Sequence, residues 1–333
     1  MTSTYNMFKL DHLKKSNKRC VLEANNVKKI GIVGAGLMGH GIALQFALKG
    51  YDVMLNDLEE GQLEQARSSI SINLKILQDL DMANDQDITS VPNRIHTSTS
   101  LEESMAEVDF VIEAVFEDLP LKLRVFEELD RHCPQRTILT SNTSSFMTSQ
   151  LVPATNRPDK VLVANWWNPP YLLPLIEVVK GPDTSDNSLK LTTDLFTNIG
   201  KTPVVLQKES LGFIGNRMQF ALLREALSIV SDGIATPEDI DKVVTNSFGR
   251  RLSVAGPLEV FDVAGWDTII HIVDQLFPNI ESSGKTPKIL TDLVQKGNYG
   301  VKSGQGFYQW DEESVKKLRE RIGETLATLD KLT

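Results

Sequence analysis

The sequence predicts an α/β protein in which a doubly wound, mostly parallel sheet is followed by an all-helical C-terminal domain. Between about residues 27 and 206, short β-rich runs alternate with amphipathic helical stretches, a pattern typical of a parallel sheet with helices on both faces. After residue 207 the β-rich runs fade, and apolar residues recur at helical spacing from 213 to 230. A chain of 333 residues is long enough for two domains with separate cores.

The predicted elements follow in order along the chain. We expect strands at residues 29–33, 52–56, 108–113, 137–140, 161–164, 175–179 and 202–206, the last of which closes the sheet. Helices are expected at residues 37–49, 59–78 and 213–230. Another helix begins at Pro237 with Thr236 as its cap, because a proline at the first helical position loses no hydrogen bond. The chain therefore divides into an N-terminal arm (1–27), a doubly wound domain (28–207) and a helical domain (208–333).

Charge and composition restrict the class of protein. The chain has 35 lysine and arginine residues against 44 aspartate and glutamate residues, and this net charge of -9 disfavours non-specific binding to nucleic acid. No apolar stretch is long enough for a membrane helix, and residues 1–27 lack the apolar core of a secretory signal. Cys20 and Cys133 are too few for a disulfide framework and have no partner at metal-ligand spacing. We expect a cytoplasmic protein with two inert thiols, no metal, and no nucleic-acid or membrane partner.

A glycine-rich turn at residues 34–39 lies between the first strand and the first helix. Gly34 permits a tight turn, Gly36 lets the backbone approach a pyrophosphate, and Gly39 lets helix and strand pack closely. Asp57 ends the next strand, where its carboxylate accepts hydrogen bonds from an adenosine ribose and repels a 2′-phosphate. This combination predicts a Rossmann-type domain that binds NAD in preference to NADP. The turn that contacts the cofactor also includes Leu37 and Met38.

Two histidines are candidates for a catalytic base. His40 belongs to the glycine turn, and we interpret it as a solvated residue at the start of a helix. His271 is the only histidine of the helical domain and lies in an apolar run, residues 269–273, where a core or interface role is expected.

Four further segments, residues 113–122, 141–145, 165–177 and 209–217, carry a resemblance to a known family. Together with the glycine turn they resemble the L-3-hydroxyacyl-CoA dehydrogenase family, and the likeness runs from about Lys28 to Trp310, including residues 300–308. The resemblance implies an NAD-dependent oxidoreductase of fatty acid metabolism that interconverts a 3-hydroxyacyl-CoA thioester and its 3-oxo form. It also implies a homodimer whose helical domain supplies substrate and dimer contacts.

The resemblance assigns roles to individual residues. Ser144 and Asn216 match residues that hold the substrate's 3-hydroxyl and neighbouring carbonyl, and Glu177 matches the carboxylate that orients a catalytic histidine. The positions that match cofactor-lining residues are Glu117, Lys122, Ser144, Asn168 and Lys302. Each of these side chains also has an ordinary interpretation as a turn or cap residue.

Asn165 stands where this family has its catalytic histidine. Oxidation of a secondary alcohol needs a base for the hydroxyl proton, and asparagine has no titratable nitrogen. Three explanations follow from this departure. Glu177 acts as the base through a water molecule, the enzyme is naturally slow, or the asparagine was introduced to disable it.

The sequence leaves the substrate class open. Coenzyme A carries several phosphates, yet residues 58–87 contain only the bases Arg67 and Lys75, against Glu59, Glu60, Glu64, Asp79, Asp81, Asp85 and Asp87. Asn73 is similar to a serine of the family in this helix. Residues 168–175 are similar to relatives that oxidise small free acids such as carnitine and gulonate. Trp166, Trp167, Tyr171 and Trp266 either wall a compact pocket suited to a quaternary ammonium group or pack between the domains.

The CoA thioester is our first expectation for the substrate and the small free 3-hydroxy acid our second. A different class of protein, an NAD-binding relative without catalytic activity, is the third.

Overall fold

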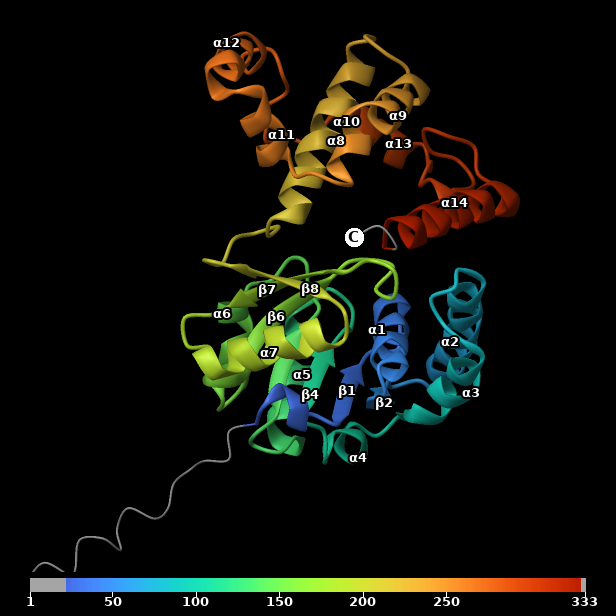
Figure 1. Cartoon of the computed structure of the whole chain (residues 1–333), viewed down its shortest axis with the longest axis vertical. Coiled ribbons are helices and arrows are strands. Elements are labelled where there is room, and N and C mark those ends of the chain that lie inside the picture. Colours follow the sequence, from blue (N-terminus) through green and yellow to red (C-terminus); the bar gives the residue numbers. More distant parts are fainter. Residues whose placement is uncertain (1–21, 331–333) are drawn as a thin grey trace, which may run out of the picture. The chain divides into compact units, whose positions relative to one another are not determined.

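The computed structural model describes residues 22–330 of the chain. The chain divides into two compact units, Met1–Leu211 and Gly212–Thr333, and Figure 1 shows the helices and strands of each. The boundary lies four residues after the one expected at 207/208. Most of the predicted arm, 1–27, lies outside the described residues, which here include only the short 3-10 helix η1 (Ala24–Asn26).

An eight-stranded sheet forms the centre of the first unit (Figure 1), with the order β3-β2-β1-β4-β5-β6-β7-β8. All neighbouring strands are parallel except β6 and β7, so the sheet is mostly parallel, as predicted. The strands are β1 (Lys29–Val33), β2 (Asp52–Asn56), β3 (Ile95–Ser98), β4 (Phe110–Glu113), β5 (Ile138–Ser141), β6 (Val161–Trp166), β7 (Leu175–Lys180) and β8 (Thr202–Leu206). The expected final strand at 202–206 is confirmed at the sheet edge.

Strand β3 was not among the predicted strands. It contains only one strongly apolar residue, Ile95, followed by His96, Thr97 and Ser98, and it lies at the sheet edge with no fully buried side chain. The central strands β4 and β5 are buried along their whole length, which produces the continuous apolar runs that the sequence displays.

Helices flank the sheet of the first unit. They are α1 (Leu37–Leu48), α2 (Glu60–Asp79), α3 (Asp85–Arg94), α4 (Leu101–Met105), α5 (Leu119–His132), α6 (Thr148–Leu151) and α7 (Asp186–Asn198). An aromatic cluster joins α1, β4, β6 and α7. The ring centroid of Trp166 lies 5.8 Å from that of Phe46 and 5.5 Å from that of Phe196, and the centroids of Phe196 and Phe110 are 5.7 Å apart. Trp166 is therefore a core residue of the first unit, which corrects both the pocket-wall and the inter-domain interpretation for this residue.

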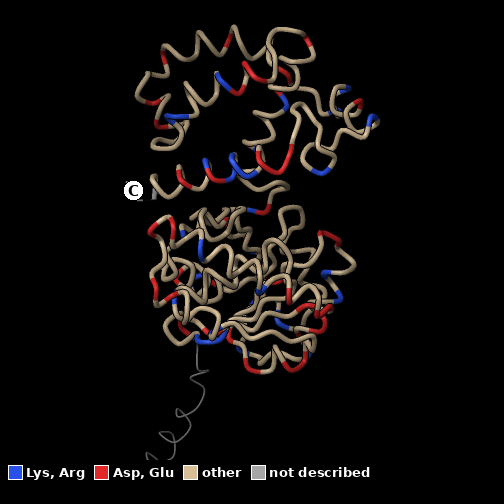
Figure 2. Tube along the Cα trace, turned by 90° about the vertical axis from the view of Figure 1, so that its right-hand side faces the viewer, with Lys and Arg blue, Asp and Glu red and all other residues tan. Residues whose placement is uncertain are grey.

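The second unit is helical, as predicted. Its helices are α8 (Gly215–Ser231), α9 (Pro237–Asn246), α10 (Phe248–Leu252), α11 (Pro257–Ala264), α12 (Trp266–Leu276), α13 (Lys288–Gln295) and α14 (Glu312–Asp330). The Thr236 cap is confirmed, since its hydroxyl accepts the Asp239 backbone N–H at 3.2 Å. Along α14, acidic and basic residues follow one another in alternating groups (Figure 2). Within residues 22–330, no helix is both long and apolar enough to cross a membrane.

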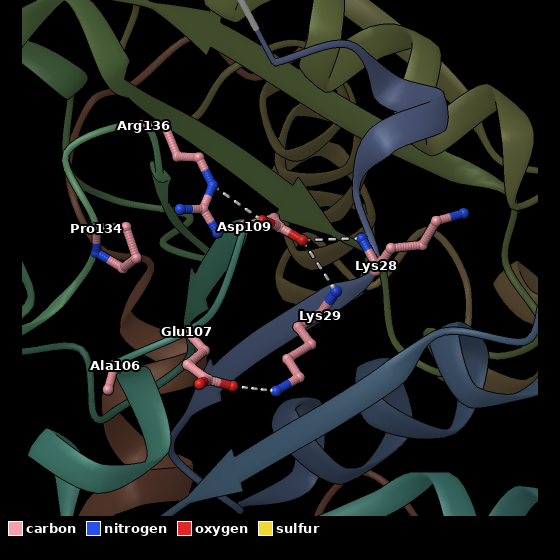
Figure 3. A pocket seen from close by; sticks show the side chains of 7 residues that line it. All are labelled: Lys28, Lys29, Ala106, Glu107, Asp109, Pro134 and Arg136. Atoms are coloured by element: carbon pink, nitrogen blue, oxygen red, sulfur yellow. Dashed lines mark hydrogen bonds and ion pairs between the residues drawn. The ribbon is translucent and has the colours of Figure 1, made fainter. Parts of the chain in front are cut away.

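A cavity of about 380 Å³ lies at the amino ends of β1 and β4 (Figure 3), at the opposite sheet edge from the predicted site. Asp109 accepts the backbone N–H groups of Lys28 and Lys29 at 2.9 and 3.2 Å, and the Arg136 guanidinium at 2.9 Å. The chain itself therefore supplies the hydrogen-bond partners of this carboxylate. These contacts connect the amino ends of β1 and β4 and have a structural role.

Candidate active site

The glycine turn connects β1 to α1 in the conformation that its sequence predicts. Gly34 has φ +100°, and a Cβ atom there would lie 2.6 Å from the carbonyl oxygen of Ala114. A Cβ atom on Gly39 would lie 1.8 Å from the carbonyl oxygen of Gly34, so only glycine allows this approach of helix to turn. A Cβ atom on Gly36 would meet no atom within 4 Å and would project into open space.

The first turn of α1 and Asp57 together suit a dinucleotide. Helix α1 begins after Gly36 with no side-chain cap and no acidic residue in its first turn, which leaves backbone N–H groups for an anion. The Asp57 carboxylate is fixed at the tip of β2, where it accepts the Ala35 backbone N–H at 2.8 Å. These residues fit NAD: the helix start would hold the pyrophosphate and Asp57 the adenosine ribose.

Exposed apolar side chains surround this turn. Leu37 is 67% exposed, Leu58 83% and Phe116 87%, although large apolar residues are usually buried. Leu58 directly follows Asp57, and Phe116 follows β4, so both lie beside the turn at the carboxyl edge of the sheet. Leu58 and Phe116 were not among the predicted site residues. For Leu58 the available signal was an apolar residue directly after a strand-terminal acid, and Phe116 lies inside the segment 113–122 that was already noted.

A buried ion pair supports the loop after β4. The Lys122 ammonium lies 2.8 Å from Glu113 and 3.2 Å from Glu117, and both Lys122 and Glu113 are almost fully buried. Burial raises the pKa of the Glu113 carboxyl, while Lys122 and the Ser141 hydroxyl act in the opposite direction. Lys122 therefore organises carboxylates in this structure, and its predicted contact with the cofactor stays a prediction.

Glu117 orders the loop that contains Ser144. Its carboxylate accepts the Thr143 hydroxyl at 2.5 Å and the backbone N–H groups of Ser144 and Ser145 at 3.1 and 3.0 Å. Burial opposes ionisation, but these hydrogen bonds and Lys122 hold the pKa of Glu117 below its usual value. The loop is thereby fixed at the carboxyl end of β5, with Ser144 partly exposed.

Asn165 and Glu177 form a buried pair across β6 and β7. The two residues are directly opposite in the antiparallel register, so their side chains share one face. The Asn165 amide Nδ2 donates to Glu177 Oε2 at 3.0 Å, and Asn165 is 5% and Glu177 1% exposed. The Trp167 indole Nε1 donates to the same oxygen at 3.3 Å. Glu177 therefore receives two neutral donors at a position where the resemblance implies one imidazole.

Two residues outside the predicted set hold the end of β6 and the loop after it. Asn142 accepts the Trp166 backbone N–H at 2.8 Å, which connects the Ser144 loop to the strand of Asn165. The Lys201 ammonium donates to the carbonyl oxygens of Pro170 and Leu173 at 2.7 and 3.0 Å and is 7% exposed. The only sequence signal for Asn142 was its place directly after a strand, within a motif already noted.

His40 is buried, and the expectation that it is solvated is wrong. It is 8% exposed because α2 and the loop after β6 cover it, and burial lowers its pKa. Its Nδ1 lies 2.8 Å from the Gly36 carbonyl oxygen and its Nε2 3.2 Å from the Asn73 amide Nδ2. The Tyr171 hydroxyl donates to Asn73 Oδ1 at 3.0 Å.

The remaining predicted site residues lie at different places. Asn168 is exposed in the loop after β6, in the first unit. Asn216 lies in the first turn of α8 and Lys302 is exposed in the 3-10 helix η4 (Val301–Ser303), both in the second unit. His271 is exposed on α12, so the interpretation that it is a core residue is wrong. The interpretation that it lies in an interface stays a prediction.

Within residues 22–330, no cluster of His, Cys, Asp and Glu side chains has the arrangement of a metal site. Burial raises the pKa of the Cys133 thiol to about 12, which agrees with an inert thiol. Cys20 lies outside the described residues.

The helix start, the carboxylate at the tip of β2 and the polar residues at the ends of β5 and β6 define a dinucleotide-dependent dehydrogenase with a helical second unit. Residues 29–210 match the family described as 3-hydroxyacyl-CoA dehydrogenase, NAD binding domain, and residues 212–310 match the C-terminal domain of the same family. The chain belongs to the 3-hydroxyacyl-CoA dehydrogenase family, and its cofactor is NAD.

Individual relatives differ in the substrate that their names give. A probable 3-hydroxybutyryl-CoA dehydrogenase of Bacillus subtilis is 35% identical over 289 residues, 86% of this chain and 99% of the relative. An L-carnitine dehydrogenase of Oceanobacillus iheyensis is 30% identical over 310 residues, 91% of this chain and 97% of the relative. A crystal structure of 5-formyl-3-hydroxy-2-methylpyridine 4-carboxylic acid 5-dehydrogenase, described as an NAD+ dependent dismutase, has a TM-score of 0.85 at 29% identity and covers 92% of this chain and 98% of that chain.

Proposed function

We propose that this chain interconverts a 3-hydroxyacyl group and its 3-oxo form with NAD, using Glu177 as the proton acceptor in place of a histidine. The observation that carries the proposal is the buried Asn165–Glu177 pair at the carboxyl edge of β6. Membership of the 3-hydroxyacyl-CoA dehydrogenase family supports the CoA thioester as the first substrate class.

The orientation of Asn165 follows from its partner. An ionised carboxylate only accepts hydrogen bonds, so the amide nitrogen of Asn165 faces Glu177 and its carbonyl oxygen Oδ1 is directed elsewhere. That oxygen can accept the hydrogen bond of a substrate hydroxyl but cannot keep the proton. In oxidation, the hydroxyl proton passes through a water molecule to Glu177, and the hydrogen on the carbinol carbon leaves as hydride. NAD, when bound, is the hydride acceptor.

Other residues position the substrate. The ordered loop around Ser144 would place a hydroxyl next to the substrate oxygen, and Asn216 would contribute from α8. Both roles are taken from the resemblance and stay predictions.

Restoring the histidine tests the proposal. We expect Asn165→His to raise kcat for reduction of acetoacetyl-CoA with NADH, and Glu177→Gln to lower the wild-type kcat by about 10²- to 10⁴-fold. The ionisation in the wild-type pH profile of kcat/KM should disappear in Glu177→Gln. A profile that keeps this ionisation in Glu177→Gln would show that another group accepts the proton. No turnover by wild type or Asn165→His, despite NADH binding, would favour the non-catalytic alternative.

A small free 3-hydroxy acid is the second candidate substrate, and α2 is the observation that favours it. The Arg67 guanidinium is already engaged by the Thr97 hydroxyl and lies 3.9 Å from Glu60. Asn73, which resembles a family serine, bonds to His40 and Tyr171. Apart from Arg67, α2 contains one basic residue, Lys75, so few basic groups on this helix remain for the phosphates of a coenzyme.

The two substrate classes are distinguished by comparing kcat/KM for acetoacetyl-CoA, free acetoacetate and 3-dehydrocarnitine in the same enzyme. A higher value for either free acid assigns the second class, and a higher value for the thioester assigns the first.

We also propose a homodimer, supported by the apolar side chains that the helical unit exposes. Leu258 is 73%, Ile270 55% and Phe277 63% exposed on or beside α11 and α12. Large apolar side chains exposed on two neighbouring helices are typical of a protein interface. The expected cytoplasmic location, based on two isolated cysteines, stays a prediction.

A further inference from the structure

Four groups form a hydrogen-bond chain from the loop after β6 to the glycine turn. The Gly36 carbonyl oxygen can only accept, so His40 Nδ1 carries the proton and donates to it at 2.8 Å. In a neutral imidazole the other nitrogen then accepts, and Asn73 Nδ2 donates to His40 Nε2 at 3.2 Å. This orientation turns Asn73 Oδ1 toward the Tyr171 hydroxyl, which donates to it at 3.0 Å. Each donor thus faces an acceptor, and the polarity of the chain is defined.

The loop that carries Tyr171 is held independently at two other points. Lys201 donates to the carbonyl oxygens of Pro170 and Leu173, and the Pro170 ring packs so closely on α1 that a Cβ atom on Gly41 would lie 2.6 Å from Pro170 Cγ. Tyr171 is therefore placed at α2 by a fixed loop, and it can act as a fixed donor for Asn73.

The far end of the chain acts on the start of α1. Because the peptide unit is planar and trans, the Gly36 carbonyl and the Leu37 N–H point in opposite directions. A hydrogen bond that holds the Gly36 oxygen inward therefore directs the Leu37 N–H outward at the helix start, where the pyrophosphate of a dinucleotide binds. The Gly36 oxygen also accepts the His40 backbone N–H at 3.2 Å, so His40 supports this peptide twice.

We propose that Tyr171 and Asn73 are positioning residues for NAD: they fix His40 in one neutral tautomer, which orients the Gly36–Leu37 peptide toward the pyrophosphate. Asn73 reaches the turn through the His40 side chain, and Tyr171 acts through Asn73. This role couples the loop that follows Asn165 to the cofactor site, and it does not depend on the substrate class.

The environment of His40 agrees with a neutral ring. The groups that face the imidazole are the Gly36 carbonyl from its own turn and Asn73 from α2, with Tyr171 and Pro170 of the loop beyond them. Burial is the main cause that lowers the pKa of His40, the Gly36 carbonyl acts in the opposite direction, and no charged side chain contributes.

The test uses Tyr171→Phe and Asn73→Leu, which keep side-chain size and remove hydrogen bonds. Affinity for NADH is measured by fluorescence titration of the full chain, without any substrate. We expect each variant to weaken NADH binding by about 3- to 10-fold, the size of one lost hydrogen bond. In the Asn73→Leu background, Tyr171→Phe should add nothing, because the link is already broken. Tyr51→Phe is the matched control, since this tyrosine also packs against α1, through Phe46, but lies outside the chain of hydrogen bonds.

A second readout separates positioning from packing. Without the Tyr171 hydroxyl, the Asn73 amide can turn and present its oxygen to a protonated imidazole. We therefore expect the pKa of His40, followed by NMR titration of its ring signals, to rise in Tyr171→Phe and to stay unchanged in Tyr51→Phe. Unchanged NADH affinity in both test variants, or a His40 pKa that does not move in Tyr171→Phe, would overturn the proposal.

Discussion

In the Asn165–Glu177 pair, asparagine in place of histidine changes the role that Glu177 must have in proton transfer. A histidine would be held in one orientation by Glu177 and could exchange a proton with the substrate. The amide of Asn165 donates a hydrogen bond to Glu177 but cannot take up a proton. Trp167 adds a second donor on the same carboxylate oxygen. The carboxylate is buried, so these two neutral hydrogen bonds help to hold it in place.

Replacing the indole of Trp167 tests this dependence. Trp167→Phe keeps an aromatic ring and removes the indole donor, so the Glu177 carboxylate loses one of the hydrogen bonds that hold it. We expect kcat to fall about 3- to 10-fold, the effect of about 1 kcal/mol. Trp266→Phe is a matched control, because that indole donates to Asp262 in the helical unit. A kcat for Trp167→Phe equal to that of the control would contradict the prediction.

The buried imidazole of His40 gives the fold a dependence on pH. Its pKa in the folded chain lies below the unfolded value of about 6.5, because burial disfavours the charged form. Above about pH 6.5 both states are neutral and the group has no effect. Below it the unfolded chain binds the proton first, so the free energy of unfolding falls as the pH is lowered through the folded pKa.

The measurement compares thermal unfolding midpoints at about pH 7.5 and pH 5.5 for wild type and His40→Gln. We expect a smaller loss of stability at the lower pH in the variant, because glutamine does not titrate. Equal losses in the two proteins would show that other groups determine the acid sensitivity.

In the connection from β1 to α1, Gly39 is required for packing, whereas Gly36 leaves space for the cofactor. On Gly39 a Cβ atom would lie 1.8 Å from a backbone oxygen, whereas on Gly36 it would enter open space. We expect Gly39→Ala to lower the free energy of unfolding by about 3 kcal/mol or more, since the main chain must move. Gly36→Ala should leave stability almost unchanged and weaken NADH binding at least about 10-fold, because its methyl group lies where the pyrophosphate approaches.

Denaturant unfolding and NADH titration of both variants make the comparison. A Gly39→Ala protein as stable as wild type, or a Gly36→Ala protein with full NADH affinity, would show that the turn is more adaptable than its geometry indicates.

The elements that the sequence predicted well are those with local signals. Apolar runs marked β1 and β4 because both are buried, and the Thr236–Pro237 pair marked the start of α9. Strand β3 has no such run, since His96, Thr97 and Ser98 are only partly covered at the sheet edge.

Some parts of the candidate site also have a local sequence signal, and others do not. Glycines and a strand-terminal acid are visible as a motif, so the cofactor turn was predicted from residues 34–57 alone. The burial of His40 was not, because it depends on Asn73 and Tyr171, which are far apart in the sequence and meet only after α2 and the loop after β6 have packed on α1. Contacts of this kind have no pattern along the chain.

The helical unit buries little of its apolar surface within one copy of the chain. Among the residues described there, α11 and α12 have no buried side chain, and Figure 1 shows this helix pair apart from α9 and α10. Val263 is 90%, Ile270 55% and Ile272 47% exposed, so the pair presents apolar side chains on several faces. Exposure of this extent is unfavourable in water and would be relieved if a second copy covered the helices, as we propose.

We therefore expect a dimer at micromolar concentration, measured by sedimentation velocity or by size-exclusion chromatography with light scattering. Ile270→Glu should shift the equilibrium toward monomer, because a buried interface would have to accept an unpaired carboxylate. Thr268→Glu introduces the same charge at an exposed polar position two residues away on α12 and should leave the dimer intact. A monomeric wild type would contradict the dimer itself, whereas a dimer unaffected by Ile270→Glu would place the interface on helices other than α12.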